Sequence, residues 1–215
     1  MSKNRNVLIA ELSDNLTVSS RAGRTVDITV LWLLFNFATA ILLIWYSGPY
    51  RAGSLQQVHD HPQFLLESLT GLLAIIMLGV SAIRSGIPSN ISGLKQYLPA
   101  LLLLLIWIGF YVVGLWSPAL EPSMLGKRAF PCYLETMAFG LPSMLMGLYL
   151  VGRLCPLHGA RTGLMIGLVA GATPALVMQF ACMYAPSHII IYHLIPGLML
   201  GVVGFFAGKY YLMKE

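Results

Sequence analysis

Six long apolar segments alternate with short polar connections along this chain. Each segment approaches the roughly 20 apolar residues that an α-helix needs to cross a membrane, and the connections are too short to hold a further globular domain. The pattern therefore predicts an all-α, polytopic membrane domain over residues 26–215. Its six transmembrane helices are expected at Val26–Ser47, Pro62–Ile83, Tyr97–Trp116, Tyr133–Val151, Thr162–Ala181 and Ile189–Tyr211.

The composition agrees with a membrane domain. Of the 215 residues, 57% are hydrophobic and only 10% are charged, and the mean hydropathy is +0.77. Soluble domains carry about 25% charged residues, so the composition excludes an ordinary soluble protein. The first apolar segment is too long for the apolar region of a signal peptide and lacks a cleavage site, so we expect an uncleaved signal anchor.

Lysine and arginine are distributed unevenly between the two sides that this topology creates. Ten lie in the N-terminal segment, the second and fourth connections and the C-terminus, whereas only Arg51, Lys127 and Arg128 lie on the other side. The positive-inside rule then places both termini in the cytoplasm. The net charge of +5 follows from this topology. Because no basic cluster has the aromatic or motif support of a nucleic-acid site, the predicted partner is the lipid bilayer, with no direct nucleic-acid contact.

The side that is poor in basic residues carries candidate chemistry. Cys132 begins the fourth predicted helix, Cys182 ends the fifth, and His188 and His193 lie near the start of the sixth. Three interpretations of the cysteine pair stay open, namely a disulfide, a site for a soft metal with Cys132, Cys182 and His193 as ligands, and two unrelated membrane cysteines. No CxxC or HxxxH pattern decides among them. No resident cofactor is predicted, only transient heavy-metal binding.

Two acidic residues lie inside predicted helices. Glu67 falls in the second helix, and Glu135 follows Cys132 by three residues and shares its helix face. An acid within a membrane segment is costly and is a functional candidate by default. Both lie close enough to the interface for water to reach them. They are therefore interpreted either as structural hydrogen-bonding groups or, together with His188 and His193, as supporting residues of the signal site.

Glycines recur at four-residue spacing in the last two predicted helices. Gly163 and Gly167 occupy one helix, and Gly197 and Gly201 occupy the other. Small residues at this spacing let helix backbones approach closely in lipid. The pattern predicts close packing between these two helices.

The N-terminal segment, residues 1–25, contains a short amphipathic helix. Leu8, Ile9, Leu12 and Leu16 fall on one helical face, and a helix of about three turns is unstable alone in water. The apolar face could be buried on the membrane surface, in a hydrophobic groove of a soluble protein, or on the chain's own helices. Acidic residues on the polar face weaken the first alternative.

The whole chain resembles the NrsF family of bacterial membrane anti-sigma factors, the negative regulators of sigma F. The resemblance rests on the motif from Leu8 to Leu12, the stretch Pro62–Glu67, Cys132 with a nearby acid, and Cys182 followed by His193. It implies an inner-membrane protein whose N-terminal segment holds an extracytoplasmic-function sigma factor. It further implies that Cys132 and Cys182 sense heavy-metal or oxidative stress on the periplasmic side.

The leading hypothesis is therefore a membrane anti-sigma factor that is not an enzyme. Walker A, HExxH, GxSxG and dinucleotide-binding patterns do not occur in the sequence. A membrane thiol oxidoreductase is one alternative, although it would need a cofactor site or a close cysteine pair. A small transporter is the other, since Pro142 and Pro174 could break helices, but charge at the membrane midplane is absent.

Overall fold

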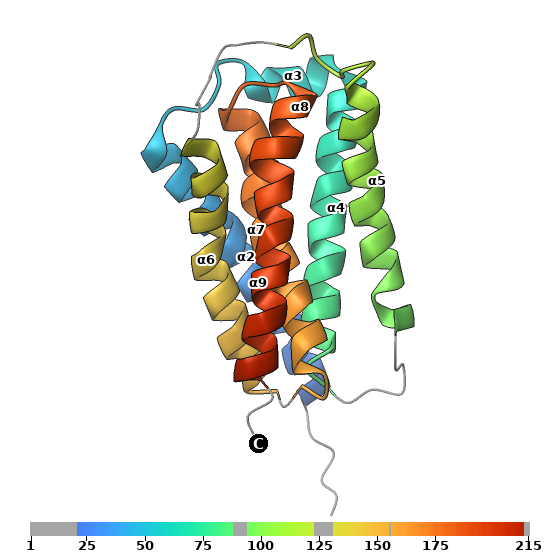
Figure 1. Ribbon diagram of the computed structural model, residues 1–215, viewed down its shortest axis with the longest axis vertical. Coiled ribbons are helices and arrows are strands. Elements are labelled where there is room, and N and C mark those ends of the chain that lie inside the picture. The colour runs from blue at the N-terminus through green and yellow to red at the C-terminus, as the bar shows by residue number, and fades with distance from the viewer. Residues whose placement is uncertain (1–20, 88–93, 123–130, 155, 213–215) are drawn as a thin grey trace, which may run out of the picture.

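The computed structural model describes residues 21–87, 94–122, 131–154 and 156–212, and the regular structure of these ranges is entirely helical. The helices form one up-and-down bundle (Figure 1). The long elements are α2 (Arg21–Ser47), α4 (Pro62–Arg84), α5 (Leu98–Gly114), α6 (Pro131–Gly152), α7 (Gly159–Ala181) and α9 (Ile195–Tyr211). The short elements are α3 (Ser54–Asp60), a 3₁₀ turn (Leu94–Gln96), α8 (Pro186–Ile189) and a π-helical turn (Ile190–Leu194) that joins α8 to α9.

Five of the helical segments are long and apolar enough to cross a membrane. They are Thr25–Ser47, α4, Cys132–Gly152, α7 and the continuous run Pro186–Tyr211. The third predicted helix, Tyr97–Trp116, is shorter than expected, because α5 has 17 residues and ends at Gly114. There the amides of Leu115 and Trp116 donate to carbonyls three residues back, a tightening that is common at helix ends.

The outer surface of the bundle is apolar as well as its core. Leu31 on α2, Leu105 on α5 and Val202 on α9 are each more than half exposed. A helix that is apolar on its outward face as well as its inward one belongs in lipid rather than in water. The long apolar helices therefore describe a membrane protein.

Other element boundaries differ from the sequence prediction in informative ways. Helix α2 begins at Arg21, so it extends into the segment assigned to residues 1–25. Helix α3 was not predicted. It begins after Gly53, whose φ of 75° lies in the left-handed region that glycine adopts without strain. Helices α4, α6 and α7 begin and end within three residues of the predicted positions. The sixth predicted helix corresponds to the run Pro186–Tyr211, which starts three residues early and comprises α8, the π-helical turn and α9.

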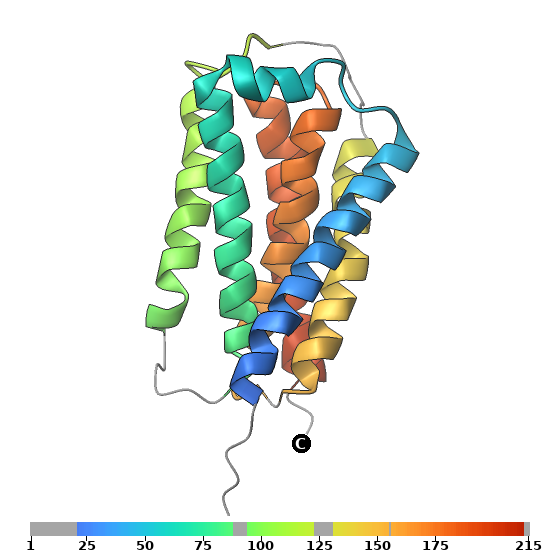
Figure 2. The same cartoon turned by 180° about the vertical axis from the view of Figure 1, so that it is seen from behind.

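The two ends of the bundle differ in chemistry. One end, called the basic end here, contains the start of α2 and the end of α9 (Figures 1 and 2). The helix ends on this side carry or adjoin Arg84, Arg153, Arg161 and Lys209. The opposite end, called the cysteine end, contains α3, α8, the start of α6 and the end of α7. Within the described ranges, Arg51 is the one lysine or arginine at the cysteine end.

Helix α7 forms the core of the bundle. It is buried along almost its whole length and packs against α2, α4, α6 and α9. Its contact with α9 is a glycine seam, in which a Cβ atom on Gly163 would lie 2.1 Å from the Gly204 carbonyl oxygen and one on Gly171 would lie 2.1 Å from that of Gly197. The predicted close packing of these two helices is therefore present.

The glycine seam leads to a stability prediction. Gly163→Ala is expected to lower the melting temperature of the detergent-solubilised protein, because the new methyl group meets backbone atoms of α9 that cannot yield locally. Overpacking costs about 1–3 kcal/mol, or roughly 2–4 °C of Tm for each kcal/mol in a chain of this size. Gly109→Ala is the matched control, since its methyl group would meet nothing within 4 Å. Equal melting temperatures for the two variants would contradict the close approach of α7 and α9.

Candidate metal-binding and thiol site

Four side chains meet at the cysteine end. Cys132 comes from the start of α6, Cys182 follows α7, His188 lies in α8 and His193 lies in the π-helical turn. One ligand atom from each of the four lies within 4.8 Å of every other. The two Sγ atoms are 3.3 Å apart, and His188 Nε2 is 3.1 Å from Cys182 Sγ. The start of α6 thus meets the segment that runs from the end of α7 to the π-helical turn, and the four predicted residues come together.

The arrangement fits a soft divalent metal ion. A tetrahedral zinc ion, bonded to sulfur at about 2.3 Å and to nitrogen at about 2.0–2.1 Å, separates its ligand atoms by roughly 3.3–3.8 Å. The measured separations, from 3.1 Å to at most 4.8 Å, bracket this range. Two thiols and two imidazoles form a common tetrahedral ligand set. The contacting thiols could alternatively form a disulfide after oxidation.

Three of the four side chains in the cluster are buried, and one is partly exposed. Cys132, Cys182 and His193 are fully buried, whereas His188 is half-buried and stacks on the ring of Tyr192 with centroids 4.7 Å apart. Three ligands thus lie in a dry, low-dielectric setting that strengthens metal bonding and slows exchange with water. His188 is the one ligand of the four that is partly exposed at the surface of the bundle.

The π-helical turn explains how two histidines five residues apart reach one site. On a regular α-helix their directions would differ by about 140°. Here the amide of Ile195 donates to the carbonyl of Ile190, five residues back, and the two imidazole centroids lie 5.1 Å apart. Such π-turns occur frequently at functional sites.

A proline supports this local structure. Pro196 has no N–H group, so the carbonyl of Tyr192 loses its α-helical partner. That carbonyl lies instead 3.2 Å from the hydroxyl oxygen of Thr136 on α6. The missing helical hydrogen bond thereby becomes a link between α6 and the chain that carries His193.

Thr136 also determines the tautomer of His193. Its hydroxyl oxygen lies 2.8 Å from the Cys132 carbonyl and 3.2 Å from the Tyr192 carbonyl, and both are acceptors. The single hydroxyl proton goes to one of these carbonyls, so the oxygen accepts from His193 Nδ1 at 3.3 Å. His193 Nε2 then carries a lone pair, and it has no hydrogen-bond partner among the described residues. A neutral imidazole fixed through one nitrogen is ready to bind a metal through the other.

The electrostatics favour a thiolate at Cys182. Its pKa is lowered, first by the hydrogen bond with the Cys132 thiol and then by the His188 imidazole, against the opposing effect of burial. Thiolate is the form that binds metals and attacks disulfides. Cys182 is therefore in the form that both metal binding and thiol–disulfide exchange require.

The two predicted acids lie beside this cluster and not in it. Glu67 is fully buried on α4, and its Oε2 accepts from the Tyr184 hydroxyl at 2.9 Å. Burial and the Glu67 charge raise the pKa of Tyr184, which keeps this donor protonated. Glu135 is half-buried on α6 and contributes no atom to the four-residue cluster.

Two residues around the cluster were not anticipated. Thr136 follows Cys132 by one helical turn, a spacing that the sequence does show. Arg51 reaches the site from the connection between α2 and α3, where its Nη1 donates to the Cys182 carbonyl at 3.2 Å. Its one sequence signal is that it is a basic residue on the side that is poor in them.

Helix α2 is hydrogen-bonded to both cysteine-bearing helices. Trp32 Nε1 donates to the Ser143 carbonyl on α6 at 2.9 Å, and Asn36 Nδ2 donates to Thr173 Oγ1 on α7 at 2.6 Å. Both residues are buried. These two hydrogen bonds join α6 and α7 to α2, the helix that directly follows the N-terminal segment in the chain.

Some predicted residues lie outside the described ranges. They are the predicted partner-binding residues Leu8, Ile9, Leu12 and Leu16, and the third cysteine, Cys155.

Comparison with known proteins identifies the family. The family model NrsF, negative regulator of sigma F, matches residues 12–213, which include every described helix. No curated protein and no solved structure gives a match. The match covers nearly the whole chain and confirms the resemblance drawn from its motifs. This chain, with its cysteine and histidine cluster at one end of an apolar helical bundle, therefore belongs to the NrsF family of negative regulators of a sigma factor.

Proposed function

We propose that this protein is a six-helix anti-sigma factor of the bacterial inner membrane. It holds an extracytoplasmic-function sigma factor through residues 1–25 and releases it when a soft metal ion binds at Cys132 and Cys182. The observation that carries the proposal is the cluster of two cysteines and two histidines in a member of a family of sigma-factor regulators.

The proposed topology has six spans with both termini in the cytoplasm. Helix α5 counts as the sixth span, because its 17 residues correspond to about 25 Å at 1.5 Å rise per residue and reach the lower limit for a spanning helix. The concentration of arginine and lysine at the basic end supports a cytoplasmic location for that end. The cysteine end then faces the periplasm, where external metal ions and oxidants arrive first.

Metal capture is favoured over disulfide formation as the primary signal. A disulfide needs only the two cysteines, whereas this site also contains two histidines, one of which has its Nε2 buried and without a partner among the described residues. Cadmium, zinc and copper prefer this set of thiolate and imidazole ligands. Oxidation of the same two thiols is the second input that the geometry permits.

Release of the sigma factor follows from a change in helix packing. A metal ion would draw in side chains from α6, from the end of α7 and from the turn before α9, and the resulting movement reaches α2 through Trp32 and Asn36. Shifting such a switch from 1:99 to 99:1 requires about 5.5 kcal/mol of differential binding. Structural zinc sites with four ligands supply about 10–16 kcal/mol, which is sufficient.

The N-terminal segment is the proposed contact with the sigma factor. The apolar face formed by Leu8, Ile9, Leu12 and Leu16 suits a hydrophobic groove on a soluble partner. A helix that folds only on binding loses conformational entropy at that step, which lowers its affinity. Binding of this segment to the sigma factor would therefore be readily reversible. Withdrawal of this segment toward the membrane would free the sigma factor.

Recovery of a sigma factor with the full-length protein from solubilised membranes tests the function. Leu12→Asp should lower that recovery, because a charge on the apolar face must be desolvated in the groove, at roughly 2–4 kcal/mol for a central contact. The matched control is Ala10→Asp, which places the same charge on the opposite face of the helix. Proteins would be identified by mass spectrometry.

Two outcomes would contradict the proposed function. Equal recovery with both variants would mean that the apolar face does not bind the sigma factor. Failure of the wild-type protein to recover any sigma factor would overturn the proposal. A thiol oxidoreductase or a small transporter would then become the function to test.

A further inference from the structure

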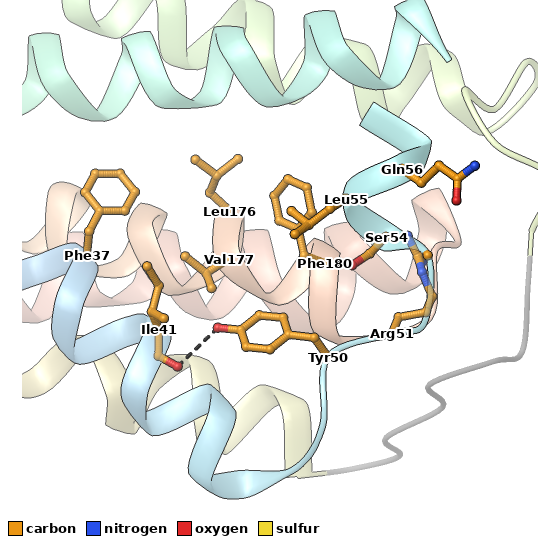
Figure 3. Close-up of a pocket in the computed structure, with 11 residues that line it drawn as sticks. Phe37, Ile41, Tyr50, Arg51, Ser54, Leu55, Gln56, Leu176, Val177 and Phe180 are labelled. Carbon is orange, nitrogen blue, oxygen red and sulfur yellow. Dashed lines mark hydrogen bonds between the residues drawn. The ribbon is translucent and has the colours of Figure 1, made fainter. Parts of the chain in front are cut away.

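A large apolar cavity lies at the cysteine end, between α2 and α7 and beneath α3. Its volume is about 600 Å³, within the roughly 300–1,000 Å³ of small-molecule sites. Phe37 and Ile41 on α2 form one wall, and Leu176 and Val177 on α7 form another (Figure 3). Arg51 and Leu55 line it toward the cysteine end.

This cavity opens onto the lipid-facing surface of the bundle. Ile41 is 45% exposed and Leu55 is 79% exposed, although both line the cavity. The back of the bundle shows α2 leaning away from α4 toward the cysteine end, with α7 visible between them (Figure 2). In a membrane, the medium outside this opening consists of lipid acyl chains.

The one charged group that lines the cavity, Arg51, has no hydrogen bond to a carboxylate within the described ranges. Arg51 is 95% buried, since its exposed fraction is 5%. Its Nη1 donates to the Cys182 carbonyl and its Nη2 donates to Gln57 Oε1 at 2.7 Å, whereas its Nε has no hydrogen-bond partner among the described residues. Both acceptors are neutral, and arginine remains protonated in proteins. A Cys182 thiolate compensates part of this charge, but the buried Nε has no acceptor among the described residues. An unpaired buried donor is costly, so an anion that accepts from it would stabilise the structure.

We propose that this cavity binds one anionic phospholipid, with an acyl chain between α2 and α7 and the phosphate at the Arg51 guanidinium. The lipid belongs to the leaflet at the cysteine end. The inference is independent of the proposed regulation of a sigma factor. It identifies a second ligand site that is separate from the cysteine and histidine cluster.

The two parts of the site have different roles. An acyl chain in the cavity gains little over one in the surrounding bilayer, because lipid tails are as apolar as the leucine and valine side chains around it. The chain therefore determines where the lipid sits but provides little selectivity. Selectivity must come from the guanidinium, which forms strong charge-assisted hydrogen bonds with phosphate oxygens and favours a headgroup of net negative charge over a zwitterionic one.

Occupancy of this site affects the thiol site through one residue. The guanidinium that faces the proposed phosphate also donates to the Cys182 carbonyl, and the Arg51 amide donates to the Phe180 carbonyl at 3.0 Å. A bound phosphate would hold Arg51 in this position. The lipid thus supports the end of α7 from which Cys182 projects.

Native mass spectrometry of the full-length protein tests the proposal. The protein would be extracted from nanodiscs of equimolar phosphatidylglycerol and phosphatidylcholine with matched acyl chains. We expect one retained lipid, with phosphatidylglycerol preferred by about tenfold, the equivalent of one charge-assisted hydrogen bond. Arg51→Gln should abolish this preference, and Arg51→Lys, which keeps the charge, should retain most of it. No preference in the wild-type protein, or equal loss in both Arg51 variants, would overturn the role of the charge.

A second pair of variants tests the cavity itself. Ile41→Trp fills the cavity and should abolish lipid retention, while the Tyr50 hydroxyl can still donate to the Ile41 carbonyl. Leu42→Trp adds the same ring at the next position, 61% exposed and outside the cavity lining, and should retain the lipid. Retention by Ile41→Trp, or displacement of the lipid by glycerol phosphate without an acyl chain, would overturn the acyl-chain site.

Discussion

Simultaneous replacement of Cys132 and Cys182 by serine is expected to abolish cadmium binding and the metal response of the regulated promoter. The two thiolates are half of the four-ligand set. If a four-ligand site contributes about 10–16 kcal/mol, the loss of half corresponds to at least about 5 kcal/mol, or roughly four orders of magnitude in affinity. Without metal binding, the sigma factor stays bound and transcription stays low.

Two measurements check this prediction. Thiolate-to-cadmium charge-transfer absorbance reports binding to the purified protein, and a reporter gene under a promoter dependent on the sigma factor reports release in cells. Cys155→Ser is the matched control, because the sequence places Cys155 in the connection between α6 and α7, on the opposite side of the membrane in the proposed topology. It should leave both readouts unchanged. Cadmium binding by the double variant at wild-type affinity would exclude the cluster as the metal site.

A histidine variant separates the metal signal from the oxidation signal. His193→Gln removes one proposed metal ligand but leaves the two thiols in contact at 3.3 Å. The cadmium response should therefore weaken while the response to a thiol oxidant persists. Equal loss of both responses would instead indicate a structural role for His193 in the packing of α6 against the π-helical turn.

The fold was largely predictable because membrane helices leave a strong signal in the sequence. A long apolar run has few alternatives in lipid, where every backbone polar group must be paired internally, and α4 and α7 accordingly begin and end within three residues of the predicted positions. The early end of α5 depends on how its last turn tightens after Gly114. Helix α3 depends on one left-handed glycine, Gly53. Hydrophobic patterns do not report such local backbone choices.

The site was predictable in its members but not in its geometry. Topology alone placed Cys132, Cys182, His188 and His193 at one depth. Their convergence depends on the π-helical turn, which places two histidines on one site at a spacing that matches no known metal motif. Arg51 is a harder case, because it reaches Cys182 across 131 positions of the chain. Contacts of that kind arise from tertiary packing and leave no local pattern.

Asn36 connects α2 to α7, and the sequence did not reveal this link between the cysteine end and the N-terminal segment. Its side-chain amide donates to Thr173 Oγ1 at 2.6 Å and lies 3.4 Å from the Val169 carbonyl, both on α7. Nine residues beyond Thr173, past the end of α7, is Cys182. In the other direction, α2 leads to the N-terminal segment that is proposed to hold the sigma factor. A rigid helix hydrogen-bonded at its middle is a physical means of transmitting motion between the two ends.

Asn36→Leu should therefore separate metal binding from release of the sigma factor. The substitution is tolerable, because the Thr173 hydroxyl still donates to the Val169 carbonyl at 2.9 Å, and because the buried Oδ1 of Asn36, which has no partner among the described residues, is removed with the amide. Replacing a buried polar contact by an apolar group of similar shape can be nearly neutral for stability. Cadmium affinity should stay at the wild-type value, while induction of the reporter gene falls to near the uninduced level.

Thr39→Val is the matched control for this experiment. Thr39 lies one turn further along α2, and its hydroxyl oxygen lies 2.9 Å from the Phe35 carbonyl and 3.0 Å from the Asn36 carbonyl. Among the described residues, its hydrogen bonds therefore stay within its own helix. Its loss should leave both cadmium affinity and induction intact. Wild-type induction in Asn36→Leu would mean that the signal reaches α2 by another contact, with Trp32 the next to test. Loss of cadmium binding in Asn36→Leu would instead show that this residue maintains the site itself, because an element that only transmits the signal can be removed without altering the affinity of the sensor.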